Sequence, residues 1–258
     1  MIEVSICVAT YNGYPYLTQQ VKSIQSQLGP DDQLIISDNG STDGTLAYLQ
    51  SIQDSRLLVL SLAHPRGPVP NFENALAHAT RPIVVLADQD DVWLPNRLKL
   101  IRGAFNEDQK RILCLVTEGE RIDSEGHVLE ASNLRVLGFR PGMVRNIIKN
   151  SYMGCCMAFS RELLKHALPI PSAVPMHDSW LGLLAECFGE VRVISEPSYQ
   201  YRIHGKNLSL QSNKSLFNKI MQRFWLSVLL VGRIFKIRLG LHSGGLRPVE
   251  KLRSRKCP

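Results

Sequence analysis

The chain has 258 residues, 44% of them apolar, and a formal net charge of +7 at neutral pH. This length and apolar content predict one large domain, or one domain with a small appendage, around a sizeable core. The first residues form a strand pattern with no basic segment before an apolar one, so we expect no secretory signal peptide. The six cysteines lack Cys-x-x-Cys spacing, which disfavours a zinc site and fits a reducing cytoplasm.

The charge is distributed unevenly along the chain. Residues 214–258 hold eleven Lys and Arg against Glu250 alone, a net charge of +10, so the first 213 residues carry −3. The body of the chain is therefore mildly acidic and the C-terminal tail is strongly basic. We expect any surface for an anionic partner to lie on this tail.

Strand and helix patterns alternate through the first 95 residues. The predicted strands cover residues 3–9, 33–37, 57–60 and 83–87, and the predicted helices cover 16–27, 46–52 and 71–79. Short connections between alternating elements predict βαβ units and a mostly parallel sheet flanked by helices, an α/β fold. The first two strands end in polar residues, at Thr10–Gly13 and Asp38–Asp43, where dinucleotide and P-loop proteins have Gly-rich motifs. A nucleotide can dock across these polar strand ends.

The strand over residues 83–87 has no polar face and runs directly into Asp88, Asp90 and Asp91. Three carboxylates this close repel one another unless water, a cation or hydrogen-bond donors neutralise them. Open α/β sheets bind their ligands at the carboxyl ends of strands. The pattern therefore predicts either a Mg²⁺ or Mn²⁺ site completed by a substrate diphosphate, or a solvated acidic turn before a helix.

In the second half of the chain, strand and helix patterns no longer alternate regularly. The patterns predict helices over 96–105 and 161–167, strands over 112–117, 152–160 and 191–194, and a hairpin over 122–129. Residues 130–150 form an irregular basic stretch, three prolines lie within 169–175, and His177–Trp180 leads into a further helix. A long irregular stretch inside a compact domain is often functional.

Six segments of the chain occur in the order in which a known family has them. They are Val8–Gly13, Ser37–Asp43, Asp88–Pro95, Gly154–Phe159, His177–Trp180 and Tyr201–Asn207. Over residues 2–210 the chain resembles the family 2 glycosyltransferases, nucleotide-sugar-dependent inverting enzymes of the GT-A fold, and it looks closest to the bacterial rhamnosyltransferase-like members. The resemblance implies a Rossmann-like nucleotide-binding sheet with an acceptor-side subregion and a C-terminal amphipathic helix.

The resemblance also implies a domain division and a set of site residues. The GT-A domain would span 1–212, with a nucleotide-sugar half in 1–95 and an acceptor half in 96–212, followed by a basic amphipathic tail in 213–258. The implied nucleotide-sugar ligands are Thr10, Tyr11, Asn12, Asp38, Asn39, Asp88 and Gln89. Asp90, Asp88 and His204 would hold Mg²⁺ or Mn²⁺, Asp178 would be the general base, and Gly154, His177 and Trp180 would lie on the acceptor side.

Three departures from the family pattern qualify the resemblance. Many relatives have a second Asp where Asn39 stands, and the Asn39 carbonyl can accept the same hydrogen bond from a nucleobase N3–H. His177 stands where Glu often precedes the base. The Gln-x-x-Arg-Trp motif and the transmembrane helices of the polymerising members are missing, which disfavours a processive synthase.

Several of these residues have a structural alternative. Asp178 suits the N-cap of the following helix as well as it suits a general base, and His204 is either a ligand of the diphosphate or metal or an ordinary loop histidine. Arg202 pairs either with phosphate or with Glu196. His64 and Arg66 lie in a Gly/Pro-rich loop that is placed to close over a diphosphate. Trp93 and Trp180 either stack on sugar rings or pack in the core.

The tail contains an amphipathic helix pattern over residues 215–239. Its apolar centre, Phe224–Gly232, is nine residues long, and a membrane span needs about 20. Basic flanks and Trp225 favour a helix lying on an anionic lipid surface, with an ordinary helix packed on the domain as the alternative. The aromatic residues lie on an apolar stripe, which disfavours nucleic-acid binding.

The sequence as a whole predicts a metal-dependent, inverting glycosyltransferase at the cytoplasmic face of the membrane. Its donor would be a dTDP- or UDP-linked sugar, and its acceptor a hydroxyl of a polysaccharide or lipid-linked precursor. The alternatives are a sugar-phosphate nucleotidyltransferase, which would need a Gly-rich loop after the first strand, and a non-catalytic membrane-surface protein. The sequence does not specify which sugar, acceptor or linkage is used, and it does not specify the oligomeric state.

Overall fold

The structure is a computed structural model, and it describes residues 1–106, 112–205, 207 and 216–241. The strands are β1 (Val4–Thr10), β2 (Gln33–Asp38), β3 (Leu57–Ser61), β4 (Ile83–Asp88), β5 (Val92–Trp93), β6 (Ile112–Ile122), β7 (Val128–Glu130), β8 (Met157–Ser160) and β9 (Gly189–Arg202). The helices are α1 (Tyr16–Gln25), α2 (Thr45–Ser51), α3 (Pro68–Ala77), α4 (Arg97–Asn106), α5 (Asn133–Leu137), α6 (Met143–Ile148), α7 (Leu163–Ala167), α8 (His177–Phe188) and α9 (Leu216–Arg238), with a 3₁₀ turn η1 (Gly154–Cys156).

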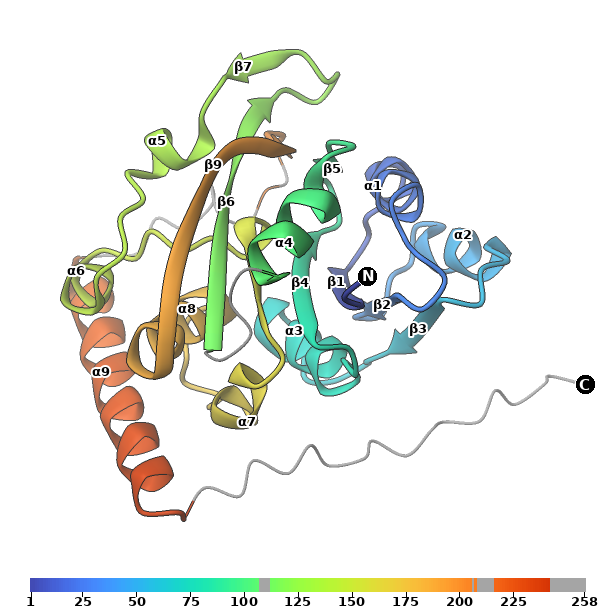
Figure 1. Ribbon diagram of the computed structural model, residues 1–258. Helices are drawn as coiled ribbons and strands as arrows, with labels where there is room; N and C mark the ends of the chain where they lie inside the picture. Colours follow the sequence, from blue (N-terminus) through green and yellow to red (C-terminus); the bar gives the residue numbers. More distant parts are fainter. Residues whose placement is uncertain (107–111, 206, 208–215, 242–258) are drawn as a thin grey trace, which may run out of the picture.

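These strands form one sheet in the order β3-β2-β1-β4-β8-β6-β9-β5, with β7 paired to β6. Strands β1 to β4 pair in parallel, β8 lies antiparallel to both β4 and β6, and β9 runs parallel to β6. Figure 1 shows the early elements on one side of the molecule and α6, α8 and α9 on the other. The predicted α/β fold with a mostly parallel sheet is confirmed.

The core follows from strands that bury both of their faces. Every residue of β4 from Ile83 to Ala87 is buried, and β1 and β2 are buried almost as completely. Apolar strands of this kind must be covered by helices on both sides of the sheet, because a solvated face would expose their side chains. Because β4 pairs with β8, the sheet continues across position 95, where the sequence suggested the boundary between two halves.

Two predictions for residues 130–160 are wrong. The stretch expected to be irregular holds α5 and α6, and only Met157–Ser160 of the expected strand over 152–160 is extended. The ends of α5 explain the first error: the Ser132 side chain accepts the Arg135 N–H at its start, and Gly138 ends it with a φ of 62°. This Ser-to-Gly spacing is a legible helix signal, although the helix has only five residues.

The last strands are longer than their sequence patterns. Strand β6 extends the prediction for 112–117 as far as Ile122, and β9 joins the expected strand at 191–194 to Tyr199–Arg202. The pairing of β6 with β9 shifts register near Glu118 and Pro197, which accommodates a proline without an N–H to donate. The hairpin around residues 122–129 is confirmed by the antiparallel pairing of β6 and β7.

Candidate active site

Three strand ends bring the predicted polar residues together. In the register of the sheet, Thr10 of β1 pairs with Asp38 of β2, and Ala9 of β1 pairs with Asp88 of β4. These neighbours lie at the carboxyl edge of parallel strands, which is where open α/β sheets bind ligands. The structure therefore gathers Thr10, Asp38 and Asp88 at one edge, although they are far apart in the sequence.

The loop after β1 is tied to the loop after β2 and to the residue after β4. Asn12 has a φ of 49°, its N–H donates to Ser41 Oγ at 2.8 Å, and its Oδ1 accepts the Thr42 N–H at 2.8 Å. The Gln89 Oε1 accepts from Thr10 Oγ1 at 2.8 Å and from the Tyr11 N–H at 2.9 Å. The polar atoms of these predicted ligands thus hold the loops in shape, while the side chain of Tyr11 is exposed.

Asp38 and Asn39 are also committed to backbone groups. The Asp38 carboxylate accepts from the N–H groups of Gly40 and Ser41, which folds the loop around it. Asn39 Nδ2 donates to the carbonyl of Leu62, and its Oδ1 accepts the Gly67 N–H at 2.8 Å. The sequence predicted that this carbonyl meets a nucleobase, whereas in the structure it anchors the loop over residues 62–67, because a buried amide needs partners for both of its ends.

The acidic residues after β4 form the second part of the site. Burial raises the pKa of Asp88 to about 7, and the negative charges of Asp90 and Asp178 contribute to this rise. Asp178 comes from α8, ninety residues further along the chain, and its charge acts on a carboxylate at the end of β4. The predicted metal ligand and the predicted base therefore belong to one electrostatic cluster.

Asp91 lies behind this cluster, in the interior. It is almost fully buried, its Oδ1 accepts the Arg202 N–H at 3.0 Å, and its Oδ2 has no hydrogen-bond partner among the described residues. Burial, with the charges of Asp90 and Asp88, holds the pKa of Asp91 well above its usual range. Ligand atoms of Asp88, Asp91 and Cys155 lie within 4.8 Å of one another.

This donor set fits a hard divalent cation through its oxygens and not through its sulfur. Burial raises the pKa of the Cys155 thiol well above its ordinary value, so the sulfur stays protonated, and Mg²⁺ and Mn²⁺ prefer oxygen ligands. The excess of carboxylates, with one buried oxygen lacking a described partner, is the charge pattern that a cation neutralises.

His204 lies against the acidic cluster. Its Nε2 is 2.7 Å from Asp90 Oδ2, and its ring stacks on Tyr16 with the centroids 4.9 Å apart. The histidine is thus part of the site and orients the carboxylate that the sequence assigned to the cation, as partners of metal-binding carboxylates do. These contacts satisfy the imidazole, as the alternative of an ordinary loop histidine requires, and they also place it beside the acidic cluster.

Asp178 occupies the first turn of α8, where the helix dipole stabilises negative charge. The N-cap position of this helix is Met176, and no side chain caps it, so the capping alternative for Asp178 is wrong. The side chain is 7% exposed. Burial raises its pKa to about 7, and hydrogen bonds from the backbone N–H groups of Ser179 and Gly154 oppose that rise. A carboxylate with this pKa changes its protonation state near neutral pH, as a general base does.

The three residues predicted on the acceptor side lie in the interior. Trp180 is fully buried and donates its indole N–H to the Ala167 carbonyl at 3.0 Å, so the prediction that it faces an acceptor is corrected to core packing. His177 is buried against Phe72, and burial lowers its pKa to about 3. Gly154 lies beside that imidazole, where an added Cβ would be 2.9 Å from His177 Nε2.

The contacts decide two further choices that the sequence left open, against the pair of Arg202 with Glu196 and for core packing of Trp93. The Arg202 guanidinium donates to the carbonyls of Asp90, Asp123 and Ser124 and to the Gln19 side chain. Trp93 is buried under the guanidinium of Arg97. Both side chains support the loops that carry the acidic residues.

Sequence patterns missed Arg97 and Asn71. Arg97 is fully buried in α4 and donates to Thr117, Ser198 and the Cys155 carbonyl, which holds η1 next to the acidic cluster. Asn71 Nδ2 donates to the Thr10 carbonyl at 3.0 Å, and its Oδ1 has no partner among the described residues. The sequence held one signal for Arg97, which is its place on the first turn of a helix shortly after Asp90 and Asp91. It held no signal for Asn71.

A curled, mostly parallel sheet with carboxylates at its strand ends defines a protein of the GT-A type. The model of the family described as Glycosyl transferase family 2 matches residues 5–168, and the chain belongs to that family. The family and fold that the motifs predicted are confirmed.

Named relatives are similar over different shares of the chain. An uncharacterized glycosyltransferase of Nostoc is 24% identical over 80% of this chain and 66% of its own length. A GalNAc(5)-diNAcBac-PP-undecaprenol beta-1,3-glucosyltransferase of Campylobacter jejuni is 31% identical over 48% of this chain and 42% of its own length. The chain thus spans less than two thirds of either relative.

A solved structure has the same fold. The S. aureus TarS fragment 1–349 in complex with UDP-GlcNAc superposes with a TM-score of 0.67 at 19% sequence identity, over 91% of this chain and 67% of that one. At this identity the likeness describes the arrangement of strands and helices.

Proposed function

We propose that the chain transfers a sugar from a nucleoside diphosphate to a hydroxyl group in one step that inverts the anomeric carbon. The observation that carries the proposal is the joint electrostatic cluster of Asp88, Asp90 and Asp178, in which the charge of one residue raises the pKa of another. Such a reaction requires a neutralised leaving group and a base on the acceptor, held in line. Family membership favours this reaction over the nucleotidyltransferase alternative.

Asp88 and Asp90 are the residues that would hold the cation, with an oxygen of Asp91 within 4.8 Å of one on Asp88. His204 Nε2 fixes Asp90 Oδ2 through their 2.7 Å contact. When bound, Mg²⁺ or Mn²⁺ would supply positive charge that stabilises a departing diphosphate. In the same step, Asp178 accepts the proton of the acceptor hydroxyl. A pKa of about 7 lets the carboxylate be ionised before the reaction and hold the proton after it.

Binding of the donor falls to the loops at the ends of β1 and β2. The ties among Asn12, Ser41, Thr42 and Gln89 fix these loops before a ligand arrives, which lowers the entropy cost of binding. The exposed Tyr11 is available to a nucleobase, and Asn39 holds the 62–67 loop that carries His64 and Arg66. We assign UDP- or dTDP-linked hexoses, rhamnose among them, as donors.

We place the acceptor in the half of the chain after residue 95 and take it to be a glycan or lipid-linked precursor at the membrane surface. The Campylobacter relative is named for an undecaprenol-linked acceptor, which supports this choice. The proposed division remains a GT-A domain in 1–212 followed by the tail.

The test is a panel of UDP-, dTDP- and GDP-linked sugars incubated with the full chain, with free nucleoside diphosphate as the readout. We expect release with one or two donors that requires Mg²⁺ or Mn²⁺ and stops with a chelator. A water-soluble polyprenyl-type glycolipid acceptor should accelerate that release. Metal-independent release, or formation of the sugar nucleotide from a sugar phosphate and a nucleoside triphosphate, would contradict the proposal.

A further inference from the structure

Helix α9 has two different faces, and one of them has no cover in the described structure. Its inner face holds Leu226 and Leu230, both buried against the domain, and it contacts α8 and α6. Figure 1 shows α9 along the outer edge of the molecule beside these two helices. For this helix the sequence left two alternatives, binding to a lipid surface and packing on the domain. The inner face explains the packing, but it does not explain the exposed apolar side chains on the other face.

The outer face of α9 is apolar from Ile220 to the end of the helix and one residue beyond. Its exposed apolar side chains recur every three or four residues, which places them on one side of a helix. They are Ile220, Phe224, Val228, Val231 and Phe235, with Leu239 just after the helix, and we call them the outer stripe. Phe224 is 57% exposed and Phe235 is 63% exposed. A contiguous apolar stripe of this size marks an interaction site.

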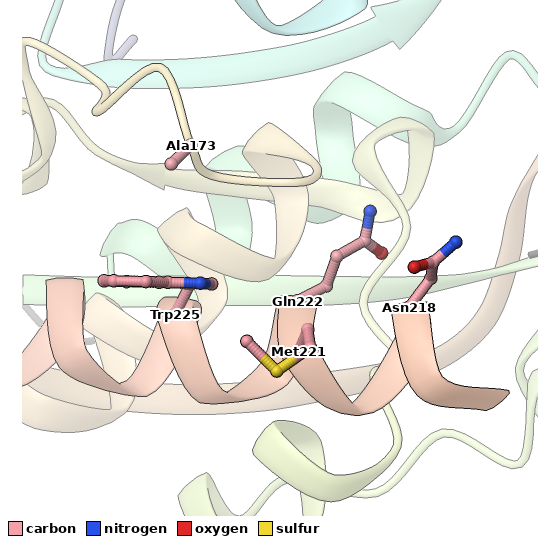
Figure 2. Close-up of a pocket in the computed structure, with 5 residues that line it drawn as sticks. All are labelled: Ala173, Asn218, Met221, Gln222 and Trp225. Atoms are coloured by element: carbon pink, nitrogen blue, oxygen red, sulfur yellow. The ribbon is translucent and has the colours of Figure 1, made fainter. Parts of the chain in front are cut away.

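Trp225 widens the outer stripe toward the body of the protein. It is 51% exposed and lines a pocket of about 280 Å³ with Met221, Gln222 and Ala173. Figure 2 shows these α9 side chains along one flank of the helix, with Ala173 across from them. A half-exposed indole beside apolar surface has the amphipathic character that favours the boundary between acyl chains and headgroups.

The charges around the stripe have one sign. The sequence of α9 holds five basic residues and no acidic one, and Arg223, Lys236 and Arg238 border the exposed face. The neighbouring helix α6 repeats the pattern, with exposed Val144 and Ile148 next to Arg145 and Lys149. Two copies of this face would bring like charges together, whereas anionic headgroups neutralise them.

We infer that the outer stripe of α9 docks the protein on an anionic lipid bilayer, with the helix lying in the plane of the interface. No helix in the described ranges is long and apolar enough to cross a membrane, which leaves surface docking as the way for this face to meet lipid. The residues after 241 add Arg247, Lys251, Arg253, Arg255 and Lys256 against Glu250 to the same end of the chain.

The helix is firmly attached to the element that carries the proposed base. Arg233 on α9 donates to the carbonyls of His166 and Pro169, and its guanidinium lies 5.2 Å from the ring centre of Trp180 on α8. Docking through α9 therefore fixes the orientation of α8, and so of Asp178, relative to the lipid surface. Only this orientation rests on the proposed function, because lipid binding itself does not depend on catalysis.

The experiment is sedimentation of the full chain with vesicles of phosphatidylcholine alone or mixed with phosphatidylglycerol. We expect binding to the mixed vesicles that weakens at high salt, and about tenfold or greater loss of that binding in Phe224→Gln/Phe235→Gln. Lys236→Gln/Arg238→Gln should lose the preference for phosphatidylglycerol. The matched control is Val128→Gln/Leu129→Gln on β7, where the two side chains are 54% and 53% exposed, and its binding should be unchanged.

Two readouts separate the possible failures. Thermal melting should show the Phe224→Gln/Phe235→Gln variant folded, and donor-dependent release of nucleoside diphosphate without vesicles should match the unaltered chain, so loss of lipid binding is read apart from loss of catalysis. The proposal is overturned if the unaltered chain ignores anionic vesicles or if this variant binds them equally well. It is also overturned if light scattering shows a dimer that the two Phe substitutions dissociate, because the stripe then pairs with a second copy.

Discussion

The loops after β1 and β2 and the acidic cluster after β4 lie at the same edge of the sheet, yet they are built in opposite ways. In the loops, the buried polar atoms of Asp38 and Asn39 bond to backbone groups around them. In the cluster, burial raises the pKa values of Asp88 and Asp178 to about 7, and the charges of Asp90 and Asp178 add to the rise at Asp88. A polar network whose hydrogen bonds are all made holds one rigid shape. Buried carboxylates that repel one another lower the stability of the fold, and binding of a cation relieves that repulsion.

The largest expected effect comes from breaking the cluster. We expect Asp90→Ala and Asp178→Asn each to lower kcat by about 10²–10⁴-fold, because one removes a carboxylate of the proposed cation site and the other removes the proposed base. The measurement is donor-dependent release of nucleoside diphosphate with acceptor present. Glu125→Gln, at an exposed carboxylate in the β6–β7 turn, is the control that should keep full activity. Near-normal turnover in either variant would contradict the assigned role.

The same cluster should make stability depend on pH. Below pH about 4 the Asp178 carboxyl is protonated in both states, but between there and about 7 it ionises only in the unfolded chain, so stability falls as pH rises. We expect Asp178→Asn to stabilise the protein at pH 8 by on the order of 1–4 kcal/mol and to leave it unchanged at pH 4. Urea titrations at the two pH values measure the difference. An equal effect at both would show that Asp178 has an ordinary pKa.

Breaking the hydrogen bonds of the loops after β1 and β2 should destabilise the protein, whereas Asp178→Asn should stabilise it. Asn39→Asp removes the amide that donates to the Leu62 carbonyl and places an acceptor there, which should cost about 1–3 kcal/mol. Asn12→Asp is the matched control, because the Asn12 Oδ1 accepts from Thr42 and a carboxylate keeps that bond. Chemical denaturation compares the two variants. Equal stability in both would mean that the loop over 62–67 does not depend on Asn39.

A substitution with an effect of similar size tests the boundary between the two regions. Gly154→Ala puts a Cβ 2.9 Å from His177 Nε2, next to Asp178, and should cost about 1–3 kcal/mol with a lower kcat. Gly103→Ala is the control, because a Cβ there meets nothing within 4 Å and Ala favours the helix. Thermal melting and the release assay check both. A Gly154→Ala variant with unchanged activity would show that close packing at Gly154 does not set the position of Asp178.

The sequence predicted the fold where a local pattern was strong. Long apolar strands and short connections indicated the parallel sheet, and six ordered motifs indicated the family. The prediction of an irregular stretch over residues 130–150 was wrong, because α5 and α6 are only five and six residues long, too short for a periodic pattern, and only α5 carries capping residues. The sequence also assigned Trp180 to the acceptor side, because motif position does not report burial.

By itself, the sequence determined the α/β class, the identity of the acidic residues and the basic character of the tail, since these follow from residue type and spacing. Only the tertiary structure decided that the charge of Asp178 acts on Asp88, that Asn39 bonds to the loop over residues 62–67, and that α9 packs through one face while exposing the other. The physical reason is that burial and hydrogen-bond partners are properties of neighbours in space, and the residues that provide them here lie tens of positions away along the chain.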